Sequence, residues 1–308
     1  MGAEATWVGL KDSERWRRIA RSGLASRLRG SPVFRSAGMA RRYAGTRYRS
    51  LREPARFETV ETVCLFLGHV KSGGTLTGAL LDAHPDALVS DEVDVVRYMK
   101  AGFGRQQIFH LIERGSRREA LKGRVTARRL DPYSLAVPGQ SQGGADQVRV
   151  LGDTRAGPTT RQLGSEPDLL DRLDGLLEPT APRFIHVVRN PYDPISAMVR
   201  RSGRSFSNAI EDHRDQCDRL LDLRRRIAPE RVLTLRYEDL TADPAGRLAR
   251  VCEFLGLAAD DGYLEACSGI VDGNRPGERT MVDWDEDSIA EVGRTIDAVD
   301  FLEGYRWG

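Results

Sequence analysis

The sequence predicts an α/β fold of three layers, in which helices flank a central parallel sheet. Beyond residue 58, short continuous apolar runs alternate with amphipathic stretches of helical spacing. Continuous runs are typical of strands that are buried on both faces, and parallel strands need crossover helices of this length between them. A glycine-rich turn also follows the first apolar run, as it does where a strand leads into a helix that binds an anion.

Five strands and three long helices are expected, in alternating order. The strands are predicted at residues 62–67, 87–89, 148–151, 184–188 and 232–235. The helices are predicted at residues 76–82, 95–113 and 208–227. Residues 131–147 contain two prolines and three glycines, so we expect a surface loop there, close to the functional site. Residues 274–277 are also interpreted as an ordinary surface loop.

The composition is that of a folded, soluble protein. Of the 308 residues, 40% are hydrophobic and 30% are charged, which is enough apolar mass for a core inside a charged surface. No stretch approaches the roughly 18 apolar residues of a membrane span, and the N-terminus lacks the apolar run of a secretory signal. The four cysteines form no CxxC pair, so neither a zinc site nor a disulfide framework is expected. With arginine strongly preferred over lysine, these features favour a bacterial, cytoplasmic protein.

Residues 1–58 are expected to form a basic N-terminal extension, and residues 59–308 the domain that carries the site. The extension holds fourteen Lys or Arg and five Asp or Glu, a net charge of +9, which leaves −7 for the rest of a chain with +2 overall. Helical spacing occurs in it only in short pieces. One interpretation is a patch for an anionic membrane surface, a nucleic acid or a partner subunit. The other, which we favour, is a solvated basic arm that packs on the acidic domain.

The strongest functional signal is the turn after the first predicted strand. Gly68 and Gly73 have the spacing of the nucleotide-binding loop GxxxxGK[ST], and Thr75 stands at its last position. Gly74 occupies the lysine position of that pattern, and Lys71 stands three residues earlier. Backbone N–H groups at a helix N-terminus bind phosphate, and glycines let the phosphate come close. The displaced cation predicts a donor other than ATP, one with a single phosphate joined to the transferred group.

Two sequence blocks resemble those of PAPS-dependent sulfotransferases, where PAPS is 3′-phosphoadenosine 5′-phosphosulfate. Residues 71–76 read KSGGTL and residues 80–85 read LLDAHP, similar to the phosphosulfate loop of the bacterial and tyrosylprotein types, [KR]SGTTL followed by LLDAHP. Residues 184–194 read FIHVVRNPYDP, similar to the strand and VRNPYD segment that binds the 3′-phosphate in that family. Weaker similarity follows at residues 236–240 and 252–257.

The resemblance implies an enzyme with a P-loop-like fold that transfers the sulfuryl group of PAPS to a hydroxyl group and releases 3′,5′-ADP. The acceptor class that it implies is a small molecule, a glycolipid or a secondary metabolite, and no metal ion is expected. We expect no nucleic-acid partner, whereas peripheral contact with a membrane through the basic extension stays open.

The matched positions imply roles for individual residues. Lys71 is expected to stabilise the leaving phosphate as negative charge grows on it. Arg189, at the end of the fourth predicted strand, offers a planar fork to the 3′-phosphate. Tyr237 is expected to contact the nucleotide base. The other donor-binding positions are Ser72, Gly73, Gly74 and Thr75 for the 5′-phosphate, and Ser196 and Arg201 for the 3′-phosphate.

A general base for the acceptor hydroxyl is expected just beyond the second predicted strand, because sites of open α/β sheets lie at that edge. In the sulfotransferases that the sequence resembles, a glutamate follows the loop lysine at this point. Aligning residues 71–76 and 80–85 with that family without a gap places Glu92, rather than Asp91, at the position of this glutamate. The alternative is that Asp91, Glu92 and Asp94 form the solvated N-terminus of a helix, where acids are favoured.

Three histidines are weaker candidates. Histidine is the usual base near neutral pH, which makes His69 and His84 candidates. The alternatives are that His69 only shapes the entry to the turn and that His84 caps the end of a helix. His186 lies inside an apolar run and is expected to be a hydrogen-bonded core residue.

Three positions depart from the family pattern. Gly74 replaces the first threonine of SGTTL, and Ala197 replaces a serine for which the neighbouring Ser196 is the expected substitute. Residues 151–155 read LGDTR where related bacterial sequences tend to carry GDK, so Arg155 is the expected second cation near the leaving group. Two alternative functions stay open: an ATP-dependent P-loop kinase, which would need a lysine next to Thr75, and a degenerate nucleotide-binding protein without transfer activity, which the departures favour.

Overall fold

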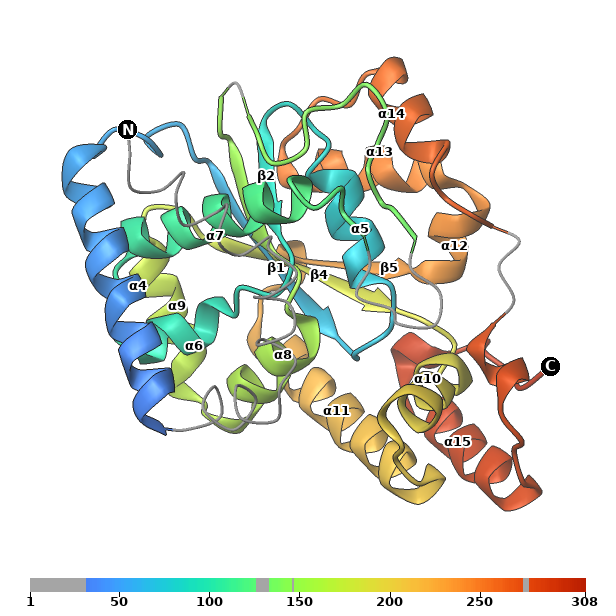
Figure 1. Cartoon of the computed structure of the whole chain (residues 1–308). Helices are drawn as coiled ribbons and strands as arrows, with labels where there is room; N and C mark the ends of the chain where they lie inside the picture. The colour runs from blue at the N-terminus through green and yellow to red at the C-terminus, as the bar shows by residue number, and fades with distance from the viewer. Residues whose placement is uncertain (1–31, 126–132, 146, 274–276) are drawn as a thin grey trace, which may run out of the picture. The chain divides into compact units, whose positions relative to one another are not determined.

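The computed structural model of the chain describes residues 32–125, 133–145, 147–273 and 277–308 (Figure 1). The predicted loop residues 131, 132, 146 and 274–276 lie outside this part. By its contacts the chain divides into two compact units, Met1–Glu53 and Pro54–Gly308, whereas the sequence suggested a boundary at residue 58. Among the described helices, none combines the length and the apolar character needed to span a membrane.

Helix α4 (Pro32–Arg52), in the first unit, is longer than the sequence suggested. It runs without interruption for 21 residues, so the expectation of helical spacing only in short pieces is wrong. Alanine and arginine are strong helix formers, and together they supply nine of these residues. Their propensity sustains a helix in which the apolar periodicity is weak.

Five parallel strands form the sheet of the second unit, in the order β2-β3-β1-β4-β5. The strands are β1 (Thr62–Gly68), β2 (Ala87–Ser90), β3 (Val150–Asp153), β4 (Pro182–Val188) and β5 (Val232–Arg236). This arrangement confirms the predicted α/β fold, although β3 begins later than expected. Because β1 lies between β3 and β4, the chain moves from β1 first toward one edge of the sheet and later toward the other. Ligands of open α/β sheets bind at such a switch point, beyond the C-terminal ends of the strands.

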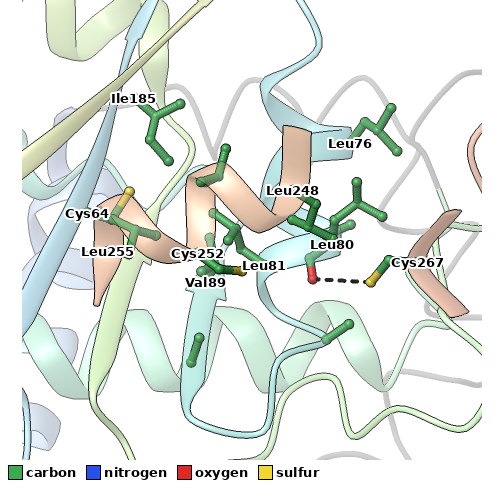
Figure 2. Close-up of a cluster of buried hydrophobic side chains, with 14 of the residues drawn as sticks. Cys64, Leu76, Leu80, Leu81, Val89, Ile185, Leu248, Cys252, Leu255 and Cys267 are labelled. Carbon is green, nitrogen blue, oxygen red and sulfur yellow. Dashed lines mark hydrogen bonds between the residues drawn. The ribbon is translucent and has the colours of Figure 1, made fainter. Parts of the chain in front are cut away.

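Helices cover both faces of this sheet (Figure 1). One face packs on α5 (Gly74–Leu81), α13 (Pro244–Leu255) and α14 (Asp261–Ser268). Figure 2 shows the core on this side, where Cys64 and Ile185 of the sheet belong to one cluster with Leu248, Cys252 and Leu255 of α13. The other face packs on α8 (Ala156–Ser165), α9 (Asp168–Leu177) and α11 (Phe206–Arg226). Every residue of β1 is therefore buried, as its continuous apolar run indicates.

The region predicted as one helix at residues 95–113 forms two helices, α6 (Val95–Lys100) and α7 (Arg105–Ala120). Gly102 between them has a φ of 81°, and Gly104 is the N-cap of α7, so the glycines end one helix and start the next. The remaining described helices are α10 (Tyr192–Ser202), α12 (Tyr237–Ala242) and α15 (Glu286–Ala298), with 3₁₀ turns at Pro229–Arg231, Glu278–Met281 and Asp300–Leu302.

Residues 133–145, the described part of the predicted surface loop, contact the C-terminal half of α5. Gln142 donates a hydrogen bond to the carbonyl of Ala79 (2.7 Å), and the N–H of Gly143 donates to the buried carboxylate of Asp82 (2.9 Å). The glycine-rich turn lies at the other end of α5. These hydrogen bonds hold Gln142 and Gly143 at the end of α5 away from the turn, and the expected position of the whole loop close to the site stays a prediction.

Candidate active site

The turn between β1 and α5 is tight, because three of its residues adopt left-handed backbone conformations. Gly68, Lys71 and Gly73 have φ values of 124°, 69° and 107°. At Gly73 only glycine fits, since a Cβ there would lie 2.3 Å from the ring of Tyr237. Non-glycine residues with this conformation are uncommon and cluster at functional sites, so Lys71 stands out. The turn leads into α5, whose first N–H groups have no partner within the helix.

Neighbouring elements hold the start of the turn in place. The N–H of Gly68 donates to Thr160 Oγ1 of α8 (3.0 Å), and Gln216 of α11 donates to the carbonyl of Gly68 (3.1 Å). A Cβ at Gly157 would lie 2.8 Å from the side chain of Val70, so α8 begins directly against the turn. The shape of the turn therefore follows from the fold itself.

Lys71, Arg189 and Tyr237 meet at the turn, although they follow three different strands. Arg189 comes after β4 and donates a hydrogen bond to the carbonyl of Lys71 (3.3 Å). Its guanidinium lies 4.5 Å from the ring centre of Tyr237, which comes after β5. The side chain of Lys71 is exposed, and among the residues that the structure describes its ammonium has no hydrogen-bond or ion-pair partner. The turn thus combines N–H donors with an available cation.

The acids that follow β2 are held by Asp153, at the end of β3. Its buried carboxylate accepts hydrogen bonds from the N–H groups of Val93 (2.9 Å), Asp94 (2.8 Å) and Val95 (3.1 Å). Burial raises the pKa of Asp153 to about 6, although these three donors act in the opposite direction. Glu92 and Asp94 have left-handed φ values of 62° and 71°. Asp153 therefore fixes the backbone from which Glu92 projects.

Glu92 and Asp91 have different partners. Glu92 Oε2 accepts a hydrogen bond from Arg155 at 2.7 Å, and the Glu92 side chain is 64% exposed. Asp91 Oδ1 accepts a hydrogen bond from Thr154 at 2.8 Å and lies 3.5 Å from Thr75 Oγ1, at the start of α5. Asp91 thus links this segment to the turn, while Glu92 carries the more accessible carboxylate.

Asp94 and His84 support the structure. Asp94 accepts a hydrogen bond from the N–H of Arg97 (3.2 Å) and so caps α6, which agrees with the helix N-terminus considered as an alternative for these acids. His84 is buried, its Nδ1 accepts from the N–H of Asp86 (3.1 Å), and its Nε2 donates to the carbonyl of Ala258 (3.0 Å). Neither nitrogen of His84 is available to an acceptor molecule.

Three buried histidines lie close to the start of the turn. His69 Nε2 lies 3.0 Å from the carbonyl oxygen of His213, and their rings stack with centroids 3.8 Å apart. His186 lies in the core, as expected, but neither of its ring nitrogens has a hydrogen-bond partner among the described residues. Burial lowers the pKa of His69 to about 4 and the pKa of His186 to about 3, and it lowers the pKa of His213 as well. All three are therefore neutral near pH 7.

The ligand atoms of His69, His213 and Cys217 lie within 4.8 Å of one another, a spacing that could hold a metal ion. Their orientation is unfavourable, since the two ring planes are within 12° of parallel and their in-plane lone pairs do not converge on one point. We assign this cluster a packing role.

We expect the free energy of unfolding to fall when the pH drops below about 6.5. The pKa values of His69 and His186 are lower in the folded protein than the value of 6.5 in an unfolded chain, so the unfolded chain binds protons first. For His186 the loss reaches about 2 kcal/mol at about pH 5, because one pKa unit corresponds to about 1.4 kcal/mol. Two buried acids act in the opposite direction, Asp153 with a folded pKa of about 6 and Asp82, whose pKa burial also raises, but three histidines have lowered pKa values.

Denaturant titrations at neutral and mildly acidic pH measure this effect. In the variant His186→Phe, the unfolding free energy should fall between neutral pH and about pH 5 by about 2 kcal/mol less than it does in the wild type. An unchanged pH dependence in the variant would assign the acid sensitivity to other groups.

Ser196 and Arg201, predicted at the 3′-phosphate, both have protein partners. Ser196 is buried, and its Oγ accepts a hydrogen bond from Trp284 Nε1 at 2.9 Å. Arg201 forms an ion pair with Glu278, which also accepts a hydrogen bond from Arg200 Nε at 3.1 Å. Binding of a phosphate by these two side chains would require them to share or leave these partners, and their assignment stays a prediction.

Sequence reasoning missed Asp153 as the anchor of the base segment and Asp193 as a partner of Arg189. Asp193 Oδ2 lies 3.5 Å from Arg189 Nε, and Asp193 Oδ1 accepts a hydrogen bond from the N–H of Arg279 at 3.0 Å. Asp153 could have been found from the sequence, because it is an acid that directly follows a short apolar run. The contact of Asp193 with Arg279 joins distant parts of the chain, and no local pattern predicts it.

Together, the fold and the turn define an α/β protein with a glycine-rich strand-to-helix turn at the switch point of its sheet. The sequence pattern of the sulfotransferase family matches residues 65–261, and the chain belongs to that family. The matched span includes the turn and the positions of Glu92, Arg189 and Tyr237.

Similarity to individual proteins is weaker, or covers less of the chain, than the match to the family. The chain is 31% identical over 96 residues to the omega-hydroxy-beta-dihydromenaquinone-9 sulfotransferase Stf3 of Mycobacterium bovis and of Mycobacterium tuberculosis. That match covers 27% of this chain and 25% of each relative, so it spans about a quarter of their length. Among solved structures, the sulfotransferase domain of the Synechococcus PCC 7002 olefin synthase has a TM-score of 0.46 and 19% identity, over 79% of this chain and 96% of that one. The sulfotransferase domain from the curacin biosynthetic pathway has a TM-score of 0.47 and 16% identity, over 78% and 97%.

Proposed function

We propose that this protein is an enzyme that transfers the sulfuryl group of PAPS to a hydroxyl group of its acceptor. The observation that carries the proposal is the turn at the switch point of the sheet, where Lys71 precedes the first N–H groups of α5 and its exposed ammonium has no partner among the described residues. Membership of the sulfotransferase family supports the assignment. An ATP-dependent kinase is disfavoured, because the lysine that it would need is Gly74 here.

Donor binding is assigned to residues around the turn. The N–H groups at the start of α5 are proposed to bind the 5′-phosphate, together with the hydroxyl of Thr75, which is exposed, whereas Ser72 is buried. Arg189 is proposed to bind the 3′-phosphate, and the ring of Tyr237 to contact the base. A Cβ at Gly74 would meet its nearest neighbours only at ordinary contact distances of 3.6 and 3.7 Å, so the absence of a side chain there is not imposed by packing.

The transfer forms one bond to sulfur and breaks one, and it moves one proton. The acceptor hydroxyl gives its proton to the Glu92 carboxylate, its oxygen bonds to sulfur, and the bond between sulfur and the 5′-phosphate oxygen breaks, which releases 3′,5′-ADP. Lys71 stabilises the negative charge that grows on the leaving phosphate. Arg155 orients Glu92 through the hydrogen bond of 2.7 Å, and Asp153 fixes the backbone of that segment.

The acceptor is proposed to be a hydroxyl group on a small molecule or lipid, with glycolipids and secondary metabolites included. The Mycobacterium relatives are named for a hydroxylated dihydromenaquinone, which supports a hydroxyl on a lipid-like molecule. The exposure of Glu92, at 64%, is compatible with an acceptor that approaches from solvent.

Thermal unfolding in the presence of nucleotides tests this function. 3′,5′-ADP without metal should stabilise the protein, by about 2.7 kcal/mol when its concentration is about 100 times its Kd. ATP with Mg²⁺ should have no comparable effect. Stabilisation by ATP with Mg²⁺ alone would contradict the proposal and support a kinase. Stabilisation by 3′,5′-ADP without sulfuryl transfer from PAPS to any of a broad panel of hydroxylated acceptors would indicate a degenerate binding protein.

A further inference from the structure

We propose that helix α4 docks this protein on an anionic lipid surface through one side of the helix. The proposal concerns the unit Met1–Glu53 and does not depend on the transferase function. The helix carries six arginines and no aspartate or glutamate along its 21 residues. It is therefore strongly cationic over its whole length, and a surface that binds it has to be anionic.

One side of α4 is apolar and exposed. Residues three or four apart fall on the same side of a helix. That spacing joins a stripe of five residues: Ala37, Ala40, Ala44, Tyr48 and Leu51. All five are exposed, Tyr48 at 59% and Leu51 at 68%. A leucine and a tyrosine exposed in line on a cationic helix are the residues that an interfacial helix places in the boundary between headgroups and acyl chains.

Arginines flank this apolar stripe on both edges. By helical position, Arg41 and Arg52 lie along one edge and Arg47 lies along the other, and all three are exposed. The guanidinium of Arg52 lies 5.3 Å from the ring centre of Tyr48, which places this cation at the edge of the stripe. Long basic side chains in such positions reach lipid phosphates while the apolar residues between them leave water.

The apolar stripe favours a lipid surface over a nucleic acid. A nucleic acid attracts basic side chains through its phosphates, and that attraction does not need exposed apolar residues between the arginines. An anionic membrane uses both features at once, since insertion of the stripe brings its flanking arginines to the headgroups. Arg42 and Arg49 lie on the opposite side of α4, so they provide a control for charge alone.

The test compares two variants of the full chain that lose the same charge from opposite sides of α4. Arg41→Gln/Arg52→Gln removes two arginines beside the stripe, and Arg42→Gln/Arg49→Gln removes two from the far side. Binding is measured by co-sedimentation with phosphatidylcholine vesicles that contain about 30% phosphatidylglycerol, and with phosphatidylcholine vesicles alone. The wild type should bind only the anionic vesicles. The stripe-side variant should bind about 25-fold more weakly, because each arginine at an anionic surface contributes about fivefold, whereas the far-side variant should lose about fivefold or less.

A third variant, Tyr48→Ser/Leu51→Ser, keeps the charge and removes the apolar side chains. It should bind the anionic vesicles about tenfold more weakly than the wild type. Circular dichroism and the melting temperature show whether each variant is folded. Equal losses in the two arginine variants, or wild-type binding by Tyr48→Ser/Leu51→Ser, would overturn the proposal in favour of diffuse charge attraction. Binding of the wild type to an RNA of random sequence but not to the anionic vesicles would overturn it in favour of a nucleic acid.

Discussion

Replacing Glu92 with glutamine should lower the turnover of sulfuryl transfer by about 10² to 10⁴, while the affinity for 3′,5′-ADP stays within about twofold. Glutamine has the size of glutamate but cannot accept the proton of the acceptor hydroxyl. Donor binding should be retained because the residues assigned to it lie on other segments, at the turn and after β4 and β5. The rate of 3′,5′-ADP formation from PAPS and a hydroxylated acceptor measures the loss, and calorimetric titration measures the affinity.

Asp91→Asn is the matched control for this variant, because it removes the same charge one residue earlier. Asp91 is less exposed than Glu92 and is assigned no proton transfer, so this variant should cost less turnover than Glu92→Gln. Near-normal turnover in Glu92→Gln together with a large loss in Asp91→Asn would transfer the role of general base to Asp91.

Replacing Lys71 with alanine should lower the turnover by about 10² to 10³, and should also weaken the binding of PAPS and 3′,5′-ADP. The ammonium is proposed to contact the bound donor and to stabilise the charge that grows on the leaving phosphate. Lys71→Ala should therefore lower donor affinity as well as turnover, whereas Glu92→Gln should lower turnover alone. Alanine keeps a Cβ at the left-handed φ of 69°, so the backbone requirement of the turn is unchanged. Steady-state kinetics with varied PAPS concentration separates the two effects.

Lys122→Ala provides the control for this variant. Lys122 lies on the surface and donates to Glu119 at 3.1 Å, so its removal should leave both turnover and donor affinity unchanged. Unchanged turnover and affinity in Lys71→Ala as well would remove Lys71 from the reaction.

The architecture could be predicted because the central strands carry their own signal. β1 is buried along its whole length, and a strand buried on both faces reads as a continuous apolar run, whatever packs on it. The break between α6 and α7 was missed because Gly102 and Gly104 interrupt the backbone without interrupting the apolar pattern. Helix α4 was missed for the opposite reason, since its helical propensity comes with little apolar periodicity.

The sequence could predict those residues of the candidate site that come directly after a strand. Parallel strands end at one edge of the sheet, so the turn after β1, Arg189 after β4 and Tyr237 after β5 were expected to lie together, and they do. The partners of Ser196 and Arg201 could not be predicted, because Trp284 and Glu278 are distant in sequence and only the packing of the C-terminal part on α10 brings them close.

A crystal structure with 3′,5′-ADP bound tests most directly the central claim that the turn between β1 and α5 is the donor site. The account predicts the 5′-phosphate against the N–H groups of residues 72–75, with the ammonium of Lys71 beside it. It predicts the 3′-phosphate at the guanidinium of Arg189. Density for the nucleotide elsewhere on the protein, with no phosphate at this turn, would contradict the account.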